Sequence, residues 1–343
     1  MPQRLVCSAP DTVSWEAYEL PKKLGPGQIR VRNTHGAEKH GTMVSFTHGH
    51  GNKRGQWDAA KQMFLPGGVV WNYPIPLGNI QVGIVEEVGG AVTKFQPGDR
   101  VAYGEGFGPT ATPAEAAAWK LKPDTCWKSA VCLDPAVFAL GALRDGQARL
   151  GDAVAVSSLG AIGLMAVQLA RRAGCRPIIA IDPLAARRDV AKATGADLAL
   201  DPVGADVGAA LREATGGRGV DVVIEYSGAM EAFQAALRGV AFGGTVVAGA
   251  FPGPMKAGLD LGAEAHMNRP NIVFSRAVSD PNRDHPRWDS ARLRDTLRQM
   301  ILAGKLDGSK IVTPVVKFDD SLREQYDAIV CNPQRGIKLG VEY

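Results

Sequence analysis

Residues Asp152–Asp182, with the sequence DAVAVSSLGAIGLMAVQLARRAGCRPIIAID, decide the fold of this chain. A short apolar run, Ala153–Val156, precedes a turn at Ser158–Gly163 that carries two glycines, and apolar residues at helical spacing follow it. This order predicts a strand, a tight turn and a helix. A second apolar run, Ile178–Ile181, ends in Asp182. In a dinucleotide-binding unit, an acid at this distance from the glycines binds the adenosine ribose.

The residues of the turn are suited to the close approach of a pyrophosphate. Gly160 allows the backbone to approach the phosphates, Gly163 allows the helix to pack closely on the strand, and the unpaired N–H groups of the helix start bind the anion. Ser158 replaces the first glycine of the usual fingerprint, so the signal depends on the flanking strand, the helix and Asp182. A strand–helix unit without a ligand is the alternative. The cofactor contacts expected from the turn are Ser158, Gly160, Ala161, Ile162 and Gly163.

Asp182 also predicts which dinucleotide binds. A carboxylate accepts hydrogen bonds from a free ribose 2′-hydroxyl and repels a 2′-phosphate, so NAD is favoured over NADP. Arg187 and Arg188 follow closely and could pair with a phosphate. With Asp182 in place, we interpret Arg187 as a contact on the adenosine side and Arg188 as solvated.

Composition and charge restrict the class of protein. The chain has 343 residues, enough for two domains, and a formal net charge of +4 without a basic cluster that would indicate nucleic-acid binding. No signal-peptide pattern and no apolar run of membrane-spanning length is present, so we expect a cytoplasmic protein. The scattered cysteines, without a CxxC pair, predict reduced thiols rather than a disulfide framework. They are Cys7, Cys126, Cys132, Cys175 and Cys331.

Periodicity divides the chain into a β-rich part and an alternating α/β part. Residues 1–125 carry alternating strand patterns, and residues 44–78 show so little periodicity that we expect a long functional loop. In residues 126–306 helices alternate with buried strands, which predicts a doubly wound parallel sheet. Residues 307–343 are expected to return to the first domain. Because ligands of such sheets bind at the carboxyl ends of the strands, the expected cofactor site also includes Ser227, Gly228 and Ala250.

The segment Val82–Val101, VGIVEEVGGAVTKFQPGDRV, resembles the signature strand pair of the medium-chain dehydrogenase/reductase superfamily. Other segments resemble that family in the same order along the chain, namely 158–163, 221–225, 243–247 and 336–339. The resemblance implies a GroES-like substrate domain built from both termini, a Rossmann domain between them, and Ile162 packed behind the nicotinamide ring. It also implies a homodimer, or a dimer-based oligomer, formed through residues near 271–278.

The zinc ligands of this family are replaced in the present chain. His40 stands where zinc-dependent members carry a cysteine, Asn79 follows Gly78 where they carry Gly-His-Glu, and Asp134 occupies a third ligand position. A catalytic zinc needs about three protein ligands. We therefore expect chemistry without a metal, while a site rebuilt from His40, His48 or His50 and Asp134 stays open.

Without zinc, the family resemblance implies an acid/base relay. Thr42 matches the hydroxyl that family members use first in a proton relay. His40 titrates near neutral pH and can act as general base in alcohol oxidation. Asn79 adds a neutral hydrogen-bonding group. Asp134 either orients a histidine or a substrate hydroxyl, or caps a turn or helix, and both interpretations stay open.

Aromatic and polar residues of the substrate domain indicate a polyhydroxylated substrate. Aromatic faces beside polar side chains suit a sugar, cyclitol or other polyol, although each tryptophan alone is more readily a core residue. The four tryptophans concerned are Trp57, Trp71, Trp119 and Trp127. Segments 261–266 and 286–289 resemble members acting on sugars and related polyols. We expect an NAD-dependent polyol dehydrogenase; the alternatives are an NADPH-dependent quinone or enoyl reductase and a non-catalytic dinucleotide-binding protein.

Overall fold

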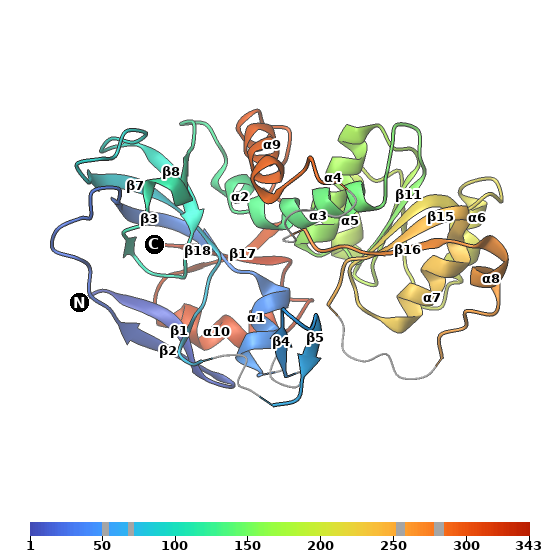
Figure 1. Cartoon of the computed structure of the whole chain (residues 1–343), viewed down its shortest axis with the longest axis horizontal. Helices are drawn as coiled ribbons and strands as arrows, with labels where there is room; N and C mark the ends of the chain where they lie inside the picture. The colour runs from blue at the N-terminus through green and yellow to red at the C-terminus, as the bar shows by residue number, and fades with distance from the viewer. Residues whose placement is uncertain (50–54, 68–71, 252–257, 278–284) are drawn as a thin grey trace. The chain divides into compact units, whose positions relative to one another are not determined.

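The computed structural model of the chain consists of two compact units (Figure 1). One unit contains residues 1–131 and 312–343, and the other contains residues 132–311. The structure describes residues 1–49, 55–67, 72–251, 258–277 and 285–343, and only the backbone of His40. In these ranges, no helix is both long enough and apolar enough to cross a membrane.

Six parallel strands form the sheet of the unit 132–311, in the order β13-β12-β11-β14-β15-β16. The strands are β11 (Val154–Ser157), β12 (Ile178–Ile181), β13 (Leu198–Leu200), β14 (Val220–Glu225), β15 (Val240–Ala248) and β16 (Asn271–Phe274). The helices are α3 (Leu133–Asp145), α4 (Ala161–Ala173), α5 (Ala185–Thr194), α6 (Val207–Glu213), α7 (Met230–Gly239), α8 (Glu264–Asn268) and α9 (Ser290–Leu302). This topology confirms the predicted doubly wound α/β fold.

Alternate residues of each strand supply the two faces of this sheet. Ala155, Ile179 and Val223 belong to a buried cluster that α6 and α7 close on one face. On the other face, Gly146 at the end of α3 lies against Val222 and Val247. Both faces are therefore apolar and covered by helices. This explains why consecutive residues of these strands are apolar in the sequence.

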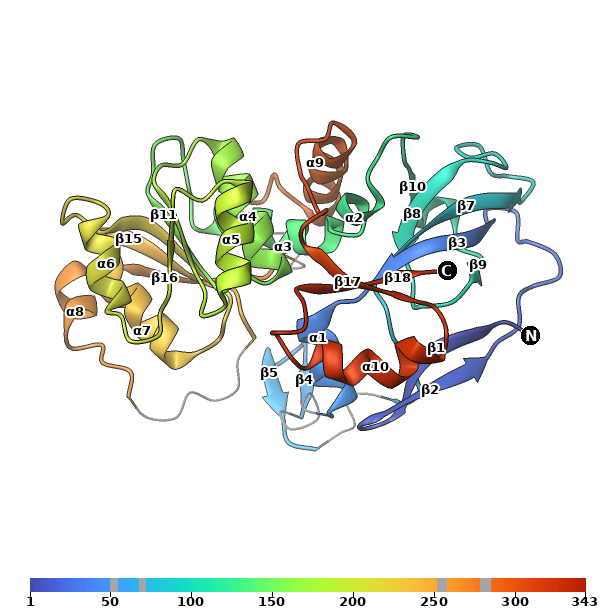
Figure 2. The same cartoon turned by 180° about the vertical axis from the view of Figure 1, so that it is seen from behind.

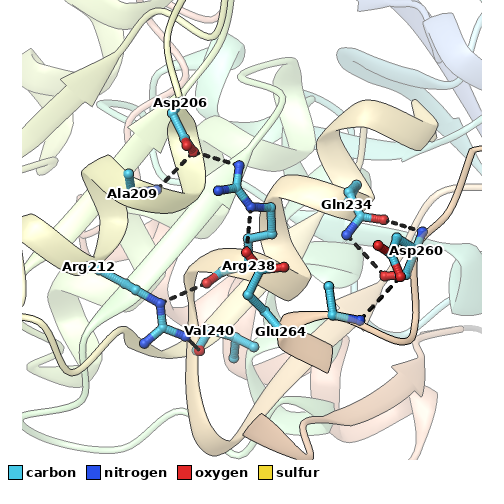
Figure 3. Close-up of polar contacts among 9 residues, drawn as sticks. Asp206, Ala209, Arg212, Gln234, Arg238, Val240, Asp260 and Glu264 are labelled. Carbon is cyan, nitrogen blue, oxygen red and sulfur yellow. Dashed lines mark hydrogen bonds and ion pairs between the residues drawn. The ribbon is translucent and has the colours of Figure 1, made fainter. Parts of the chain in front are cut away.

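Arg238 of α7 joins three helices of the same unit (Figure 3). Its guanidinium donates to Asp206 at the start of α6 and to Glu264 of α8, each at 2.9 Å. Arg212 of α6 donates in turn to the main-chain oxygens of Arg238 and Val240, both at 2.9 Å. These charged contacts fix the mutual positions of helices that otherwise pack through apolar side chains.

The other unit is built mainly from strands of both ends of the chain. One sheet has the order β10-β8-β7-β3-β18-β17 with β9 beside β3, a second has the order β2-β1-β6, and β4 pairs with β5. The strands are β1 (Gln3–Ala9), β2 (Thr12–Ala17), β3 (Ile29–Ala37), β4 (Gln56–Asp58), β5 (Met63–Leu65), β6 (Ile75–Pro76), β7 (Ile80–Val88), β8 (Arg100–Gly104), β9 (Thr110–Ala111), β10 (Ala118–Lys120), β17 (Val312–Lys317) and β18 (Lys338–Glu342). The helices are α1 (His40–Thr47), α2 (Trp127–Ala130) and α10 (Asp320–Val330). Helix α10 contacts β2, β17 and β18 (Figure 2).

Residues 44–78 contain more regular structure than the sequence indicated. Helix α1 extends to Thr47, and the strands β4 and β5 form a hairpin within the expected irregular loop. Strands of three residues are too short to show a period. The prediction of a long irregular loop was therefore wrong for these parts of the segment.

Strand β16 forms one edge of the parallel sheet and exposes apolar side chains. Ile272 is 41% exposed and Phe274 is 82% exposed. The homodimer contact predicted near residues 271–278 includes this strand. It stays a prediction, which light scattering of the purified protein would test.

Candidate functional site

The turn between β11 and α4 has a backbone that only particular residues can adopt. Ser158 has φ of +74°, in the left-handed region that glycine occupies most easily, and its N–H donates to the Ile181 oxygen at 2.9 Å. A Cβ on Gly163 would lie 1.9 Å from the main-chain oxygen of Ser158. A Cβ on Gly160 would meet nothing within 4 Å. The turn is thus tightly packed at Gly163 and open at Gly160.

Asp182 connects this turn to the next strand–helix connection. Its side chain, in a residue only 4% exposed, accepts the N–H of Leu159 at 2.8 Å and the N–H of Leu184 at 2.9 Å. Each carboxylate oxygen has a further lone pair for a ligand hydroxyl. The Arg187 guanidinium lies 4.0 Å from the Asp182 carboxylate, and burial lowers the pKa of Arg187. Arg188 is not solvated as expected: it donates to the Asp182 main-chain oxygen and pairs with Asp201.

A buried acid also organises the residues that follow β14. Glu225 is 2% exposed, and its carboxylate accepts the N–H of Ser227 at 2.5 Å and that of Gly228 at 3.1 Å. Burial raises the pKa of Glu225 despite these donors. Glu225 was not among the predicted site residues, because, unlike Asp182, it does not stand at the distance from the glycine turn that marks a ribose-binding acid.

The cofactor-site residues predicted from the sequence follow neighbouring parallel strands. Ser158 follows β11, Asp182 follows β12, Ser227 follows β14 and Ala250 follows β15. They therefore lie together at the carboxyl ends of the strands. Helix α4 also begins there, with Ala161 after the open turn at Gly160. An open glycine, the free N–H groups of a helix start and a carboxylate are the groups that bind a dinucleotide. The residues present fit that cofactor.

Two segments of the unit formed by residues 1–131 and 312–343 carry three of the four predicted catalytic residues, and the fourth, Asp134, lies in α3. His40 and Thr42 lie in the first turn of α1, and Asn79 immediately precedes β7. Among the residues that the structure describes, none accepts a hydrogen bond from the buried Nδ2 of Asn79. An amide donor buried in this way costs about 1 to 3 kcal/mol. Asn79 is therefore a candidate to donate a hydrogen bond to an oxygen atom of a ligand.

Glu38 joins these two segments and was not predicted as a site residue. It is completely buried between β3 and α1, and its carboxylate accepts the N–H of Gly78 at 2.9 Å and that of Lys39 at 2.7 Å. The hydroxyl of Tyr326 in α10 donates to the same carboxylate at 2.6 Å. Burial raises the pKa of Glu38, although these donors and the charge of Lys338 act in the opposite direction. One carboxylate thus holds the start of α1 and the segment before β7 together.

The residues described do not assemble a zinc site. In the ranges that the structure covers, no three His, Cys, Asp or Glu side chains are grouped so that they could hold a metal ion. His48 instead contacts the Asp11 carboxylate through Nδ1 and Cys331 Sγ through Nε2. Asp134 lies in the first turn of α3, and the N-cap position of that helix is held by Cys132 rather than by Asp134. His50 lies outside the described residues.

The tryptophans expected near the substrate have different environments. Trp119 is buried, and the Trp127 ring stacks on His35 with the ring centroids 4.3 Å apart. Trp57 is 51% exposed and makes an edge contact with Phe64 across the β4–β5 hairpin. Trp71 lies outside the described residues. Of the tryptophans described, Trp57 best keeps an aromatic face accessible to a ligand.

The fold and the residues at the carboxyl ends of the parallel strands define a class of protein. It is an enzyme with a nucleotide-binding domain and a separate β-rich domain. Residues 161–287 match the zinc-binding dehydrogenase family, and residues 36–132 match the alcohol dehydrogenase GroES-like domain. The chain is 39% identical to D-guloside 3-dehydrogenase of Escherichia coli (strain K12), and the alignment covers 99% of this chain and 100% of the relative. The chain belongs to the zinc-type medium-chain dehydrogenase/reductase superfamily and is a dehydrogenase.

Solved structures of two other proteins share the fold over the entire chain. The 2R,3R-butanediol dehydrogenase of Bacillus subtilis has a TM-score of 0.79 and 20% sequence identity, with 100% of both chains covered. A protein of Sinorhizobium meliloti 1021, solved with NADP bound, has a TM-score of 0.78 and 21% identity, with 100% of this chain and 99% of that chain covered. These likenesses confirm the GroES-like and Rossmann arrangement implied by the sequence.

Replacing the two glycines of the turn should separate folding from cofactor binding. Gly163→Ala brings a methyl group against a main-chain oxygen, so we expect a lower denaturation midpoint together with loss of dinucleotide binding. Gly160→Ala meets open space at a backbone angle that alanine tolerates, so we expect wild-type stability and weaker binding alone. Thermal denaturation and fluorescence titration measure both effects. Equal stability of the two variants would contradict the close packing of α4 on β11.

Removing the Tyr326 hydroxyl should destabilise the protein in a pH-dependent way. The hydroxyl stabilises the ionised Glu38 carboxylate, so its loss in Tyr326→Phe should cost about 1 to 3 kcal/mol where Glu38 is ionised and less where it is protonated. Because burial raises the pKa of Glu38, the cost should grow as the pH rises through the weakly acidic range. Urea denaturation at several pH values measures it.

Tyr73→Phe is the matched control for that experiment. The Tyr73 hydroxyl donates to the main-chain oxygen of Phe46 at 2.7 Å, an acceptor that does not titrate. Its cost should therefore stay constant over the same pH range. A parallel pH dependence of the two variants would show that Glu38 is not the group responsible.

Proposed function

We propose that this dehydrogenase uses NAD to oxidise a secondary hydroxyl group of a sugar, cyclitol or other polyol to a ketone, or catalyses the reverse reaction, without a catalytic zinc. The observation that carries the proposal is the Asn79 amide, whose buried Nδ2 has no hydrogen-bond partner among the described residues and which stands where zinc-dependent relatives have a ligand. The similarity to a D-guloside 3-dehydrogenase over the full chain supports a sugar ring as the substrate class.

The preference for NAD rests on Asp182. When bound, NAD supplies the chemistry of the reaction by accepting a hydride from the carbon that bears the hydroxyl. The Asp182 carboxylate accepts hydrogen bonds from the ribose hydroxyls, and it repels a 2′-phosphate at the same position. The main-chain N–H groups of Ala161 and Ile162 at the start of α4 bind the pyrophosphate that the open side of Gly160 admits. Arg187, beside Asp182, contacts the adenosine side.

The proton of the substrate hydroxyl passes to residues at the start of α1. His40 acts as general base in oxidation and as general acid in reduction, and Thr42 carries the proton as a relay hydroxyl. The Asn79 amide donates a hydrogen bond to the substrate oxygen as negative charge develops on it. Asp134 is retained as the candidate for orienting a substrate hydroxyl or a histidine. The exposed face of Trp57 offers a surface for the apolar face of a sugar ring.

Substitution of His40 and Asn79 should lower turnover without changing NAD affinity. His40→Ala removes the acid/base group, and Asn79→Ala removes a donor to the developing oxyanion, which is typically worth about 100-fold to 1000-fold in kcat. His266→Ala, at an exposed histidine of α8, is the control and should retain full turnover. Initial rates and NAD titrations of all three variants give the result. An unchanged kcat in Asn79→Ala would show that the Asn79 amide does not act in turnover, and it would contradict the proposal.

The purified protein should prefer NAD and should contain no stoichiometric zinc. We expect NAD to bind at least about tenfold more tightly than NADP, because placing a phosphate against a carboxylate costs on the order of 1.4 kcal/mol or more. Binding titrations with both cofactors, followed by elemental analysis and assays after chelation, measure these properties. A preference for NADPH would favour the quinone or enoyl reductase alternative. One zinc per chain would indicate a rebuilt metal site, and cofactor binding without turnover on sugars, alcohols and carbonyls would indicate a non-catalytic protein.

A further inference from the structure

Asp11, His48 and Cys331 form a hydrogen-bonded cluster that the proposed dehydrogenase chemistry does not use. Asp11 lies in the turn between β1 and β2, His48 is the C-cap of α1, and Cys331 is the C-cap of α10. The three residues therefore come from three separate elements of the unit formed by residues 1–131 and 312–343. Cys331 is exposed, so reagents in solution can reach it.

The order of the groups in this cluster is a carboxylate, an imidazole and a thiol. His48 Nδ1 contacts the Asp11 carboxylate, and His48 Nε2 lies 3.0 Å from Cys331 Sγ. The carboxylate holds the imidazole proton on Nδ1, which leaves the Nε2 lone pair to accept the thiol proton. A base oriented in this way by a third group is the arrangement that activates a cysteine nucleophile.

The charges around Cys331 determine how its thiolate can form. Burial together with the nearby carboxylates of Asp327 and Asp11 raises the pKa of the Cys331 thiol. A free thiolate is therefore disfavoured, and the sulfur reacts as its proton passes to His48 Nε2, which lies 3.0 Å away. The Asp11 carboxylate, in contact with Nδ1, holds the ring in the orientation that this transfer needs.

The other cysteines provide a comparison within the same chain. Cys7, Cys132 and Cys175 are buried, and Cys126 is exposed like Cys331. Among the described residues, no histidine is hydrogen-bonded to the Cys126 sulfur. The two exposed thiols thus differ in the presence of an oriented imidazole.

We propose that Cys331 is a nucleophilic thiol, activated by His48 and Asp11, and is a modification site for hydrogen peroxide and other soft electrophiles. With peroxide, His48 Nε2 takes the thiol proton and the sulfur attacks one peroxide oxygen. An S–O bond forms, the O–O bond breaks, and the leaving hydroxide takes the proton from His48 to become water. The sulfur is oxidised by two electrons to a sulfenic acid while the peroxide is reduced. This proposal is independent of the proposed dehydrogenase reaction.

The rates of alkylation of Cys331 and Cys126 test the proposal directly. Iodoacetamide is added to the native full chain at neutral pH, and peptide mass spectrometry follows each cysteine over time. We expect Cys331 to react at least about tenfold faster than Cys126, because the oriented His48 removes the thiol proton as the sulfur attacks. After treatment with hydrogen peroxide, dimedone should label Cys331 and not Cys126.

Two variants show whether the histidine and the carboxylate are responsible. His48→Asn should reduce the Cys331 rate to that of Cys126, and Asp11→Asn should reduce it in part. Asp11 has φ of +59°, a conformation that asparagine tolerates well, so the second variant keeps its fold if the first does not. Equal rates for Cys331 and Cys126 in the wild type, or a Cys331 rate unchanged in a folded variant, would overturn the proposal.

Discussion

The close contact between β11 and the start of α4 is the constraint on which the nucleotide-binding unit depends. A hydrogen atom at Gly163 is all that fits against the Ser158 main-chain oxygen, so the helix begins directly beyond the strand. Asp182 then holds the same turn to the following connection through the Leu159 N–H. Together these contacts place the start of α4, the open turn at Gly160 and the Asp182 carboxylate at the carboxyl ends of the parallel strands.

In the unit formed by residues 1–131 and 312–343, a buried carboxylate holds separate chain segments together. In a zinc site, one cation holds ligands from several segments in fixed positions. Here the Glu38 carboxylate accepts N–H groups from the two segments that carry His40, Thr42 and Asn79, and Tyr326 adds a third donor from α10. A buried anion surrounded by donors is thus a second way to hold separate chain segments together.

The parts of this structure that could be predicted are those whose physical cause is local in sequence. The turn at 158–163 and Asp182 were predictable, because the glycines, the two flanking strands and the acid all lie within one short stretch of the sequence. Glu38 was missed because its partner Tyr326 lies 288 residues away. The hairpin β4–β5 was missed because its strands are too short to show a period. Arg188 was misinterpreted because its partners, the Asp182 oxygen and Asp201, become neighbours only when β12 and β13 pair.

The division of the chain into units has a consequence for synthesis on the ribosome. Residues 132–311 are contiguous, so that unit can fold once its last helix, α9, has emerged. Strand β3 emerges earlier, but it lacks its neighbour β18 until residues 338–342 have been made. Strand β3 therefore completes its sheet only after the unit of residues 132–311 has been made. During that interval its strand edge is exposed to other chains, so chaperone demand should fall mainly on the N-terminal part of the nascent protein.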